Sequence, residues 1–146
     1  MNPLQQLVAN YKQGRKIGMY SACTANELVI EACLERAKKD QAYVLIEATA
    51  NQVNQYGGYS GMTPQDFREY VHRIAARVGF PEAYIILGGD HLGPLTFSHL
   101  PAAKSMEEAQ ELVRQFAAAG FAKIHIDTSM RLGGDDPNQK LGTELI

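Results

Sequence analysis

Polar side chains follow each of four apolar runs in this sequence, and their types suit acid–base and metal chemistry. The sharpest pair is Asp90-His91, in which a carboxylate that can move a proton stands next to an imidazole that can ligate a metal. An acidic residue in such a place also commonly caps a turn or is solvated, so the case for a polar site rests on four such positions in succession. The candidates after the four runs are, in order, Ser21 and Cys23, Glu47, Asp90 and His91, and Asp127, Thr128 and Ser129.

The pair Asp90-His91 lies within the segment GGDHLGP, residues 88–94. Neighbouring residues on a regular strand face opposite ways, so both can serve one site only where the backbone bends, and the two glycines permit such a bend. The sequence shows no complete ligand set such as H-x-x-x-H, and His72 and His99 gain no role from their spacing. His91 is therefore a single candidate ligand, and a structural role for it stays open.

The four apolar runs predict strands, and the segments between them predict helices. The expected strands are 17–22, 43–46, 84–87 and 123–126. Strict alternation of strands and helices favours a parallel sheet with right-handed crossovers, in which the carboxyl ends of the strands meet at one edge. On the last strand, alternation puts Lys123, His125 and Asp127 on one face and two isoleucines on the other, so we expect His125 and Asp127 to point inward.

Helix signals separate these strands. An amphipathic helix opens the chain, with Leu4, Leu7, Val8 and Tyr11 on one face. The predicted N-caps of the later helices are Thr24, Thr63 and Ser105, the last in a capping box with Glu108. The expected buried face of the helix after Thr24 holds Leu28, Val29, Ala32 and Leu34. A further helix is expected to start within 141–146.

The segment 49–62 is long for a connection between a strand and a helix, which usually takes about 2–6 residues. Its glycine-rich part includes Gly57 and Gly58, whose backbone amides could wrap a small anionic ligand. A loop without a binding role fits the composition equally well. We keep both interpretations, with Gly57 and Gly58 as candidate substrate-binding residues.

The motifs that are missing narrow the α/β class to one architecture. The first strand is not followed by the dinucleotide-binding motif G-x-G-x-x-G, and the phosphate-loop motif G-x-x-x-x-G-K-[ST] occurs nowhere in the sequence. No motif therefore supports a doubly wound nucleotide-binding fold. The remaining architecture is the TIM (βα)₈ barrel, which takes about 250 residues. We therefore expect residues 1–146 to be the N-terminal half of a single (βα)₈ barrel domain, with four βα units after an N-terminal helix and no internal domain boundary.

Composition and charge exclude several classes of function. The 146 residues include 14 basic and 16 acidic side chains, for a net charge of −2, which does not suit nucleic acid or anionic membranes. The start lacks the pattern of a signal peptide, and no apolar run approaches the roughly 20 residues that span a bilayer. Cys23 and Cys33 form no disulfide framework. A cytoplasmic location is the expectation.

Three segments together identify a family resemblance: residues 47–64 (EATANQVNQYGGYSGMTP), 86–94 (ILGGDHLGP) and 123–127 (KIHID). They closely resemble the Z-type subunit family (GatZ/KbaZ) of bacterial D-tagatose-1,6-bisphosphate aldolase, whose members are similar to class II aldolases in being (βα)₈ barrels. The resemblance implies a role in splitting tagatose-1,6-bisphosphate into glycerone phosphate and glyceraldehyde 3-phosphate, in galactitol or N-acetylgalactosamine catabolism. It also implies an accessory subunit in a hetero-oligomer, supporting the stability and activity of a catalytic Y-type subunit.

The resemblance also implies roles for individual residues. Asp90 looks like the proton-transfer carboxylate of class II aldolases, retained or vestigial, and His91 looks like one ligand of their Zn²⁺, whose other histidines lie in the later half of such barrels. The expected substrate-binding residues, for a sugar phosphate, are Ser21, Glu47, Gly57, Gly58, Asp127 and Ser129. The alternative function is a zinc-dependent class II sugar-bisphosphate aldolase in its own right.

Overall fold

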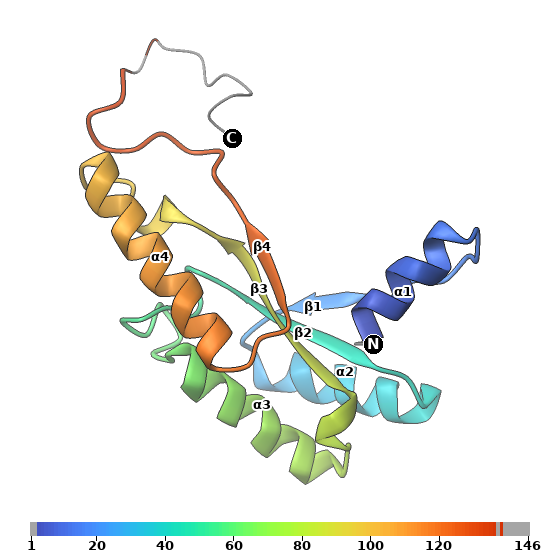
Figure 1. Cartoon of the computed structure of the whole chain (residues 1–146). Helices are drawn as coiled ribbons and strands as arrows, with labels where there is room; N and C mark the ends of the chain where they lie inside the picture. The colour runs from blue at the N-terminus through green and yellow to red at the C-terminus, as the bar shows by residue number, and fades with distance from the viewer. Residues whose placement is uncertain (1–2, 137, 139–146) are drawn as a thin grey trace.

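A computed structural model describes residues 3–136 and 138 as an alternating series of helices and strands (Figure 1). In this part of the chain the elements are α1 (Pro3–Lys12), β1 (Ser21–Cys23), α2 (Glu27–Asp40), β2 (Val44–Thr49), α3 (Pro64–Val78), β3 (Ile85–Leu92), α4 (Ala102–Ala118) and β4 (Lys123–Ile126), with short 3-10 helices at Glu82–Tyr84 and Pro94–Phe97. The predicted order of helices and strands is confirmed. The helix expected within 141–146 lies outside the described residues.

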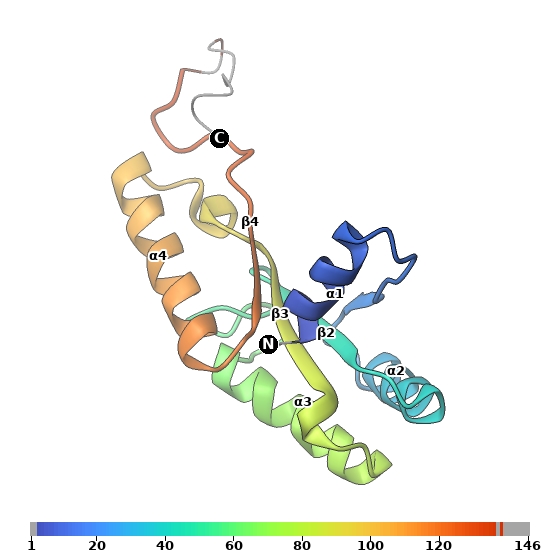
Figure 2. The same ribbon diagram turned by 45° about the vertical axis from the view of Figure 1, so that its right-hand side comes forward.

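The four strands are parallel and stand in the sheet in their chain order, β1-β2-β3-β4. Helices α2, α3 and α4 lie side by side along one face of the sheet, and α1 lies apart from them (Figure 1, Figure 2). Crossovers of one hand that always step in the same direction produce this arrangement. The predicted α/β class with a parallel sheet is confirmed, and the carboxyl ends of the four strands lie at one edge.

The apolar core fills the space between the sheet and the three helices. Its largest fully buried side chains include Ile46 of β2, Phe67 of α3 and Phe116 of α4. The ring of Phe121, just before β4, lies 4.6 Å from that of Phe116 and 6.2 Å from that of Phe67, between ring centroids. These aromatic contacts join α3, α4 and the last strand, and so fix the sheet edge that carries β4.

Helix α3 begins and ends where its sequence signals predict. The hydroxyl of Thr63 accepts a hydrogen bond from the amide of Asp66, and the carboxylate of Asp66 accepts one from the amide of Thr63, which completes a capping box. Pro64 occupies the first turn, where its missing N–H costs nothing. Gly79 ends the helix at φ 69°, in the left-handed region that glycine adopts without strain.

Helix α2 differs from the prediction in its cap and in its buried face. The cap is Asn26, whose side chain accepts hydrogen bonds from the amides of Leu28 and Val29. The start therefore shifts by two residues from the predicted Thr24, and the buried positions are Ile30, Leu34 and Ala37. Leu28 and Val29 were expected on the buried face, but Leu28 is 76% exposed and Val29 is 46% exposed.

Helix α4 begins earlier than predicted, and the expected capping box is wrong. The helix starts at Ala102, so Ser105 lies inside it, fully buried, and its hydroxyl donates to the carbonyls of Phe97 and Leu100. Glu108 instead accepts hydrogen bonds from the side chains of the loop that follows β2. The pattern S-x-x-E misled because both residues make tertiary contacts, which the local sequence does not specify.

The strands keep the predicted positions but not all the predicted lengths. Strand β4 matches its prediction, whereas β2 and β3 extend further, to Thr49 and Leu92. Strand β1 is shorter than the predicted 17–22, since it spans only Ser21–Cys23. Ile17 and Tyr20 are exposed. The apolar face expected of α1 is only partly covered, since Leu4 and Leu7 are half-buried while Val8 and Tyr11 are exposed. None of the helices described is long and apolar enough to cross a membrane.

Candidate functional site

The polar residues at the strand ends form one continuous chain of contacts across all four strands. The hydroxyl of Ser21 on β1 donates to a carboxylate oxygen of Glu47 on β2. The other oxygen of Glu47 lies 2.5 Å from the ammonium of Lys123 on β4, and that ammonium lies 3.2 Å from Oδ1 of Asp90 on β3. Nδ1 of His125 lies 2.9 Å from the same oxygen of Asp90. The predicted convergence of strand-end residues is therefore observed for Ser21, Glu47 and Asp90.

Glu47 is buried at the centre of this chain because a glycine on the next strand leaves room for it. Its exposed fraction is 3%, and in the sheet it stands beside Gly88, which in turn stands beside Lys123. A β-carbon at Gly88 would overlap the carboxylate of Glu47. A buried carboxylate requires a counter-charge, which Lys123 supplies. Gly88 thus serves the site by its small size.

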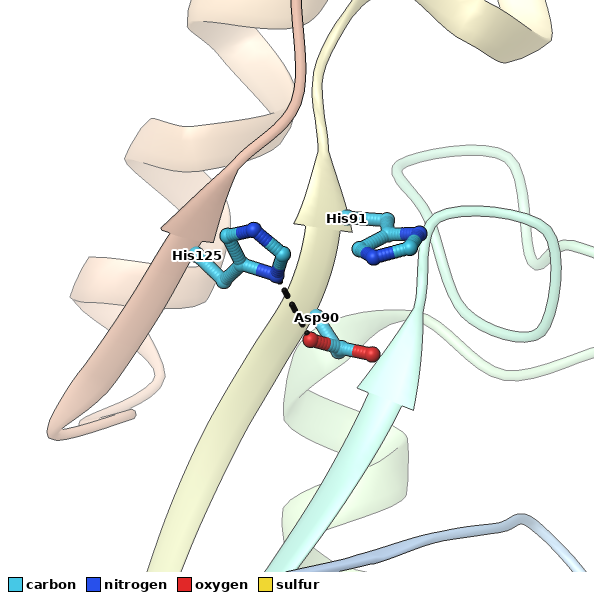
Figure 3. A group of neighbouring side chains, drawn as sticks. All are labelled: Asp90, His91 and His125. Carbon is cyan, nitrogen blue, oxygen red and sulfur yellow. Dashed lines mark hydrogen bonds and ion pairs between the residues drawn. The ribbon is translucent and has the colours of Figure 1, made fainter.

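The backbone bends at Asp90 and His91 as predicted, but the glycines before them do not make the bend. Gly89 stands opposite Ile124 and Leu92 opposite Ile126, so Asp90 and His91 together face the single residue His125. Two residues against one define a β-bulge, which re-aims side chains. His91 itself takes the left-handed conformation, at φ 51°. The bulge lets both Asp90 and His91 face the same site (Figure 3).

The charges around Asp90 keep its carboxyl group ionised. Partial burial acts to raise the pKa of Asp90, but the hydrogen bonds from His125 and Lys123 outweigh it and leave that pKa below its ordinary value. For Lys123, burial acts to lower the pKa, and the contacts with Glu47 and Asp90 raise it above the ordinary value instead. Lys123 is therefore a charged, ion-paired lysine rather than a neutral nucleophile.

Asp127 joins the site from the segment after β4, and Ser129 serves it only through Asp127. Oδ2 of Asp127 lies 4.0 Å from Nδ1 of His91. Oδ1 accepts a hydrogen bond of 2.9 Å from the amide of Ser129, and contacts with Ser129 lower the pKa of Asp127. Ser129 itself is exposed. The substrate-binding roles predicted for both residues stay predictions, and the contact with His91 supports only that of Asp127.

The loop after β2 is folded on itself, which removes the basis for one prediction. The amide of Gly58 donates to Oδ1 of the buried Asn54, and that of Gly57 donates to the carbonyl of Asn54. The loop is also tied to α4, since the side chains of Gln55 and Tyr56 donate to the carboxylate of Glu108. The prediction for Gly57 and Gly58 assumed free amides, and these two amides are engaged within the loop.

Two residues of the cluster, Lys123 and His125, carried no assigned role in the sequence. Lys123 and His125 were placed on the inward face of the last strand by alternation alone, and the structure shows that both contact Asp90. The signal was present, but a lysine or a lone histidine on a strand has no motif. Cys23 lies in the same region, and burial, with the nearby charges of Asp90 and Glu47, raises the pKa of its thiol to about 11. It is therefore not a reactive thiolate near neutral pH.

The residues present also include a donor set suited to a metal ion. One ligand atom each from Asp90, His91 and His125 lies within 4.8 Å of the others, in the part of the chain described (Figure 3). A carboxylate with two imidazoles fits zinc and similar transition metals, so these residues fit the metal that the resemblance implies. Asp90 and His91 come from β3 and His125 from β4, so the bulge is what brings the three together.

The fold and the site define an α/β protein with sequentially ordered parallel strands and a charged cluster at their carboxyl ends, the place where such proteins hold small-molecule sites. Residues 4–146 match the family model described as "D-tagatose-1,6-bisphosphate aldolase subunit GatZ/KbaZ-like". The chain belongs to this family, and the resemblance found in its motifs is confirmed.

Curated relatives and one solved structure agree with this assignment. The chain is 51% identical over 134 residues to the D-tagatose-1,6-bisphosphate aldolase subunit GatZ of Salmonella newport (strain SL254), and 53% identical over 132 residues to that of Escherichia coli (strain K12). These alignments cover 92% and 90% of this chain. A probable tagatose 6 phosphate kinase from Sinorhizobium meliloti 1021 superposes with a TM-score of 0.80 at 54% identity, over 82% of this chain. The chain spans 31% of the length of each of these proteins.

Proposed function

We propose that residues 1–146 form the N-terminal half of a single (βα)₈ barrel domain, without an internal domain boundary. The sequential strand order supports this, because a doubly wound sheet reverses its order at a switch point. Among the described strands β1 and β4 each pair on one side only, and apolar side chains flank both edges. These exposed side chains are Tyr20, Leu28 and Val29, which line one hollow next to β1, and Met106 and Ile126, which line another that includes the end of β4.

The protein that contains this half acts as an accessory subunit of tagatose-1,6-bisphosphate aldolase. It supports the stability and activity of a separate catalytic Y-type subunit in a cytoplasmic hetero-oligomer, in the pathway that forms glycerone phosphate and glyceraldehyde 3-phosphate. The observation that carries this proposal is the family match over residues 4–146, together with relatives that are themselves named as aldolase subunits. A subunit name implies an assembly of several chains.

The strand-end cluster is a polar site at which a sugar phosphate would bind. Ser21 and Asp127 present oxygen atoms, and Lys123 adds a positive charge, although Glu47 and Asp90 already engage that charge. Asp90 is ionised and hydrogen-bonded to His125, so it can accept a proton and share it with the imidazole. A metal ion held by Asp90, His91 and His125 would supply a Lewis acid that polarises a substrate carbonyl.

The test compares the purified full-length protein, the Y-type subunit, and the two co-expressed. The accessory role predicts no cleavage of tagatose-1,6-bisphosphate by this protein alone, and a faster, longer-lived activity of the Y-type subunit in its presence. The variant Asp90→Asn should support the Y-type subunit as well as the unmodified protein does, with His99→Gln, an exposed histidine outside the cluster, as the control.

Three results would overturn the proposal. Cleavage by the isolated protein that Asp90→Asn abolishes would establish the alternative, an aldolase in its own right. Transfer of phosphate from ATP to tagatose 6-phosphate would instead establish the activity named for the Sinorhizobium meliloti protein. An unchanged Y-type activity in the presence of this protein would also refute the accessory role.

A further inference from the structure

Within the strand-end cluster, the side chains of Asp90, His91 and His125 form a compact group of three metal-type donors. The two imidazoles lie edge to face, with ring centroids 4.7 Å apart, on neighbouring strands (Figure 3). His91 and His125 are 56% and 46% exposed at their side chains, so both rings can be reached from solvent. Two accessible imidazoles beside an ionised carboxylate form the kind of donor set that binds zinc.

The backbone at His91 is strained in a way that serves this arrangement. A residue with a β-carbon at φ 51° costs free energy, of the order of 1 kcal/mol or more, and His91 is not at a helix end, where such a conformation is common. Without the bulge, His91 would point to the opposite face of β3, toward the helices. The strained conformation therefore brings a second donor to the side where Asp90 and His125 already lie.

The surrounding charges favour a cation at this place. Glu47, Asp90 and Asp127 contribute three carboxylates, whereas Lys123 is the ammonium that contacts two of them. The cluster therefore carries a net negative charge when its histidines are neutral. Both contacts of Asp90 with Lys123 and His125 use Oδ1, so its other oxygen takes part in neither.

We propose that Asp90, His91 and His125 bind a divalent transition-metal ion of the zinc type. Their ligand atoms lie within 4.8 Å of one another, whereas tetrahedral bonds of about 2.0–2.1 Å place ligands roughly 3.4 Å apart, so the exposed rings must close inward on binding. Oδ2 of Asp127 lies 4.0 Å from Nδ1 of His91, so it would orient that imidazole from outside the ligand set once the ring moves inward. The new element is His125: a three-donor site is complete on β3 and β4, whereas the resemblance places the partners of His91 later in the chain.

This inference does not depend on the proposed function, because it concerns the isolated protein. A metal in an accessory subunit would stabilise the carboxyl ends of β3 and β4, and a metal in an enzyme would also act on substrate. The experiment below is therefore carried out without the Y-type subunit and without measuring cleavage. Failure of metal binding leaves the accessory role standing, and failure of the accessory role leaves the metal site standing.

In the first experiment the metal-free protein is titrated with Co²⁺, and binding is followed by the visible absorption of the Co²⁺ complex. A parallel titration with Zn²⁺ is followed by calorimetry. One equivalent should bind, and His91→Gln and His125→Gln should each weaken binding at least about tenfold, while His72→Gln and His99→Gln leave it unchanged. Circular dichroism and the urea midpoint establish that each variant is folded. Absence of stoichiometric binding, or equal affinity in His125→Gln and the unmodified protein, overturns the proposal.

A second measurement is made on the unmodified protein. Residues 1–146 hold four histidines, so nitrogen NMR of the imidazoles, with signals assigned by single His→Gln variants, can follow each of these four as Zn²⁺ is added. The ring signals of His91 and His125 should shift together at one equivalent, and those of His72 and His99 should stay in place. A shift of His91 without His125 would overturn the assignment of His125, even if the protein binds the metal.

Discussion

Replacing Lys123 with methionine should destabilise the protein through the carboxylate that it leaves behind. Methionine keeps most of the apolar stem but removes the ammonium, so Glu47, 3% exposed, retains only the hydroxyl of Ser21 as a donor. Breaking a buried ion pair on one side costs about 3–5 kcal/mol. Because the side chain of Lys123 is 30% exposed, water replaces part of the lost interaction, and we expect a loss of about 2–3 kcal/mol.

The assay is equilibrium unfolding in urea, with two comparison variants. Lys104→Met removes an exposed lysine that pairs with Glu107 on the surface of α4, so it should change the free energy of unfolding little. The double variant Glu47→Gln with Lys123→Met removes both charges, and should recover most of the stability lost in the single variant. A loss in Lys123→Met no larger than in Lys104→Met, or a double variant as unstable as the single one, would refute the reasoning.

Other substitutions test the core, the helix cap and the loop separately. Phe116→Ala should cost about 3–5 kcal/mol in urea unfolding, because the ring is fully buried; a cost under 1 kcal/mol would contradict the packing described. Thr63→Ala should cost about 1 kcal/mol through loss of the α3 cap. Thr63 also lowers the pKa of Asp66, so the stability from that contact is present above the ordinary pKa of 3.8 and is lost as the pH falls through the lowered value. The variant should therefore lose less stability on acidification, as thermal melts at several pH values will show. Asn54→Ala should cost about 1–3 kcal/mol and speed hydrogen exchange at the two loop amides that Asn54 accepts from, while exchange in α3 stays slow.

The order of the elements could be predicted from the sequence because it depends on local signals. The capping residues at Thr63, the glycine at 79 and the apolar runs act within a few residues of themselves, and the structure follows them. The errors arose where tertiary contacts decide. The pattern predicted Leu28 and Val29 on the buried face of α2, but that helix buries Ile30 and Leu34 instead. It also predicted Ser105 as a helix cap, but the hydroxyl of Ser105 donates to carbonyls that precede the helix.

The sequence predicts which strands supply residues to the site, but it does not predict which of those residues contact one another. Alternation and strand ends bring Glu47, Asp90 and Asp127 to one edge, because parallel strands all end there. The bulge at His91 is different, since its one extra residue depends on how β3 pairs with β4. A sequence without its pairing partner does not show which residue is extra. For this reason His125 was placed inward by alternation but could not be joined to Asp90.

The chain of charges across the four strands also bears on why these residues are present. A buried ion pair such as Glu47–Lys123 is weak evidence for stability, because apolar residues of similar volume often replace such a pair without loss. If the double variant Glu47→Gln with Lys123→Met is as stable as the unmodified protein, the charges are not needed for the fold. They would then serve to hold the Asp90 carboxylate in place, because Lys123 contacts the same oxygen of Asp90 as His125 does. Metal affinity in the double variant should then fall although the fold is intact. Unchanged stability together with unchanged Co²⁺ affinity would separate Glu47 and Lys123 from the site altogether.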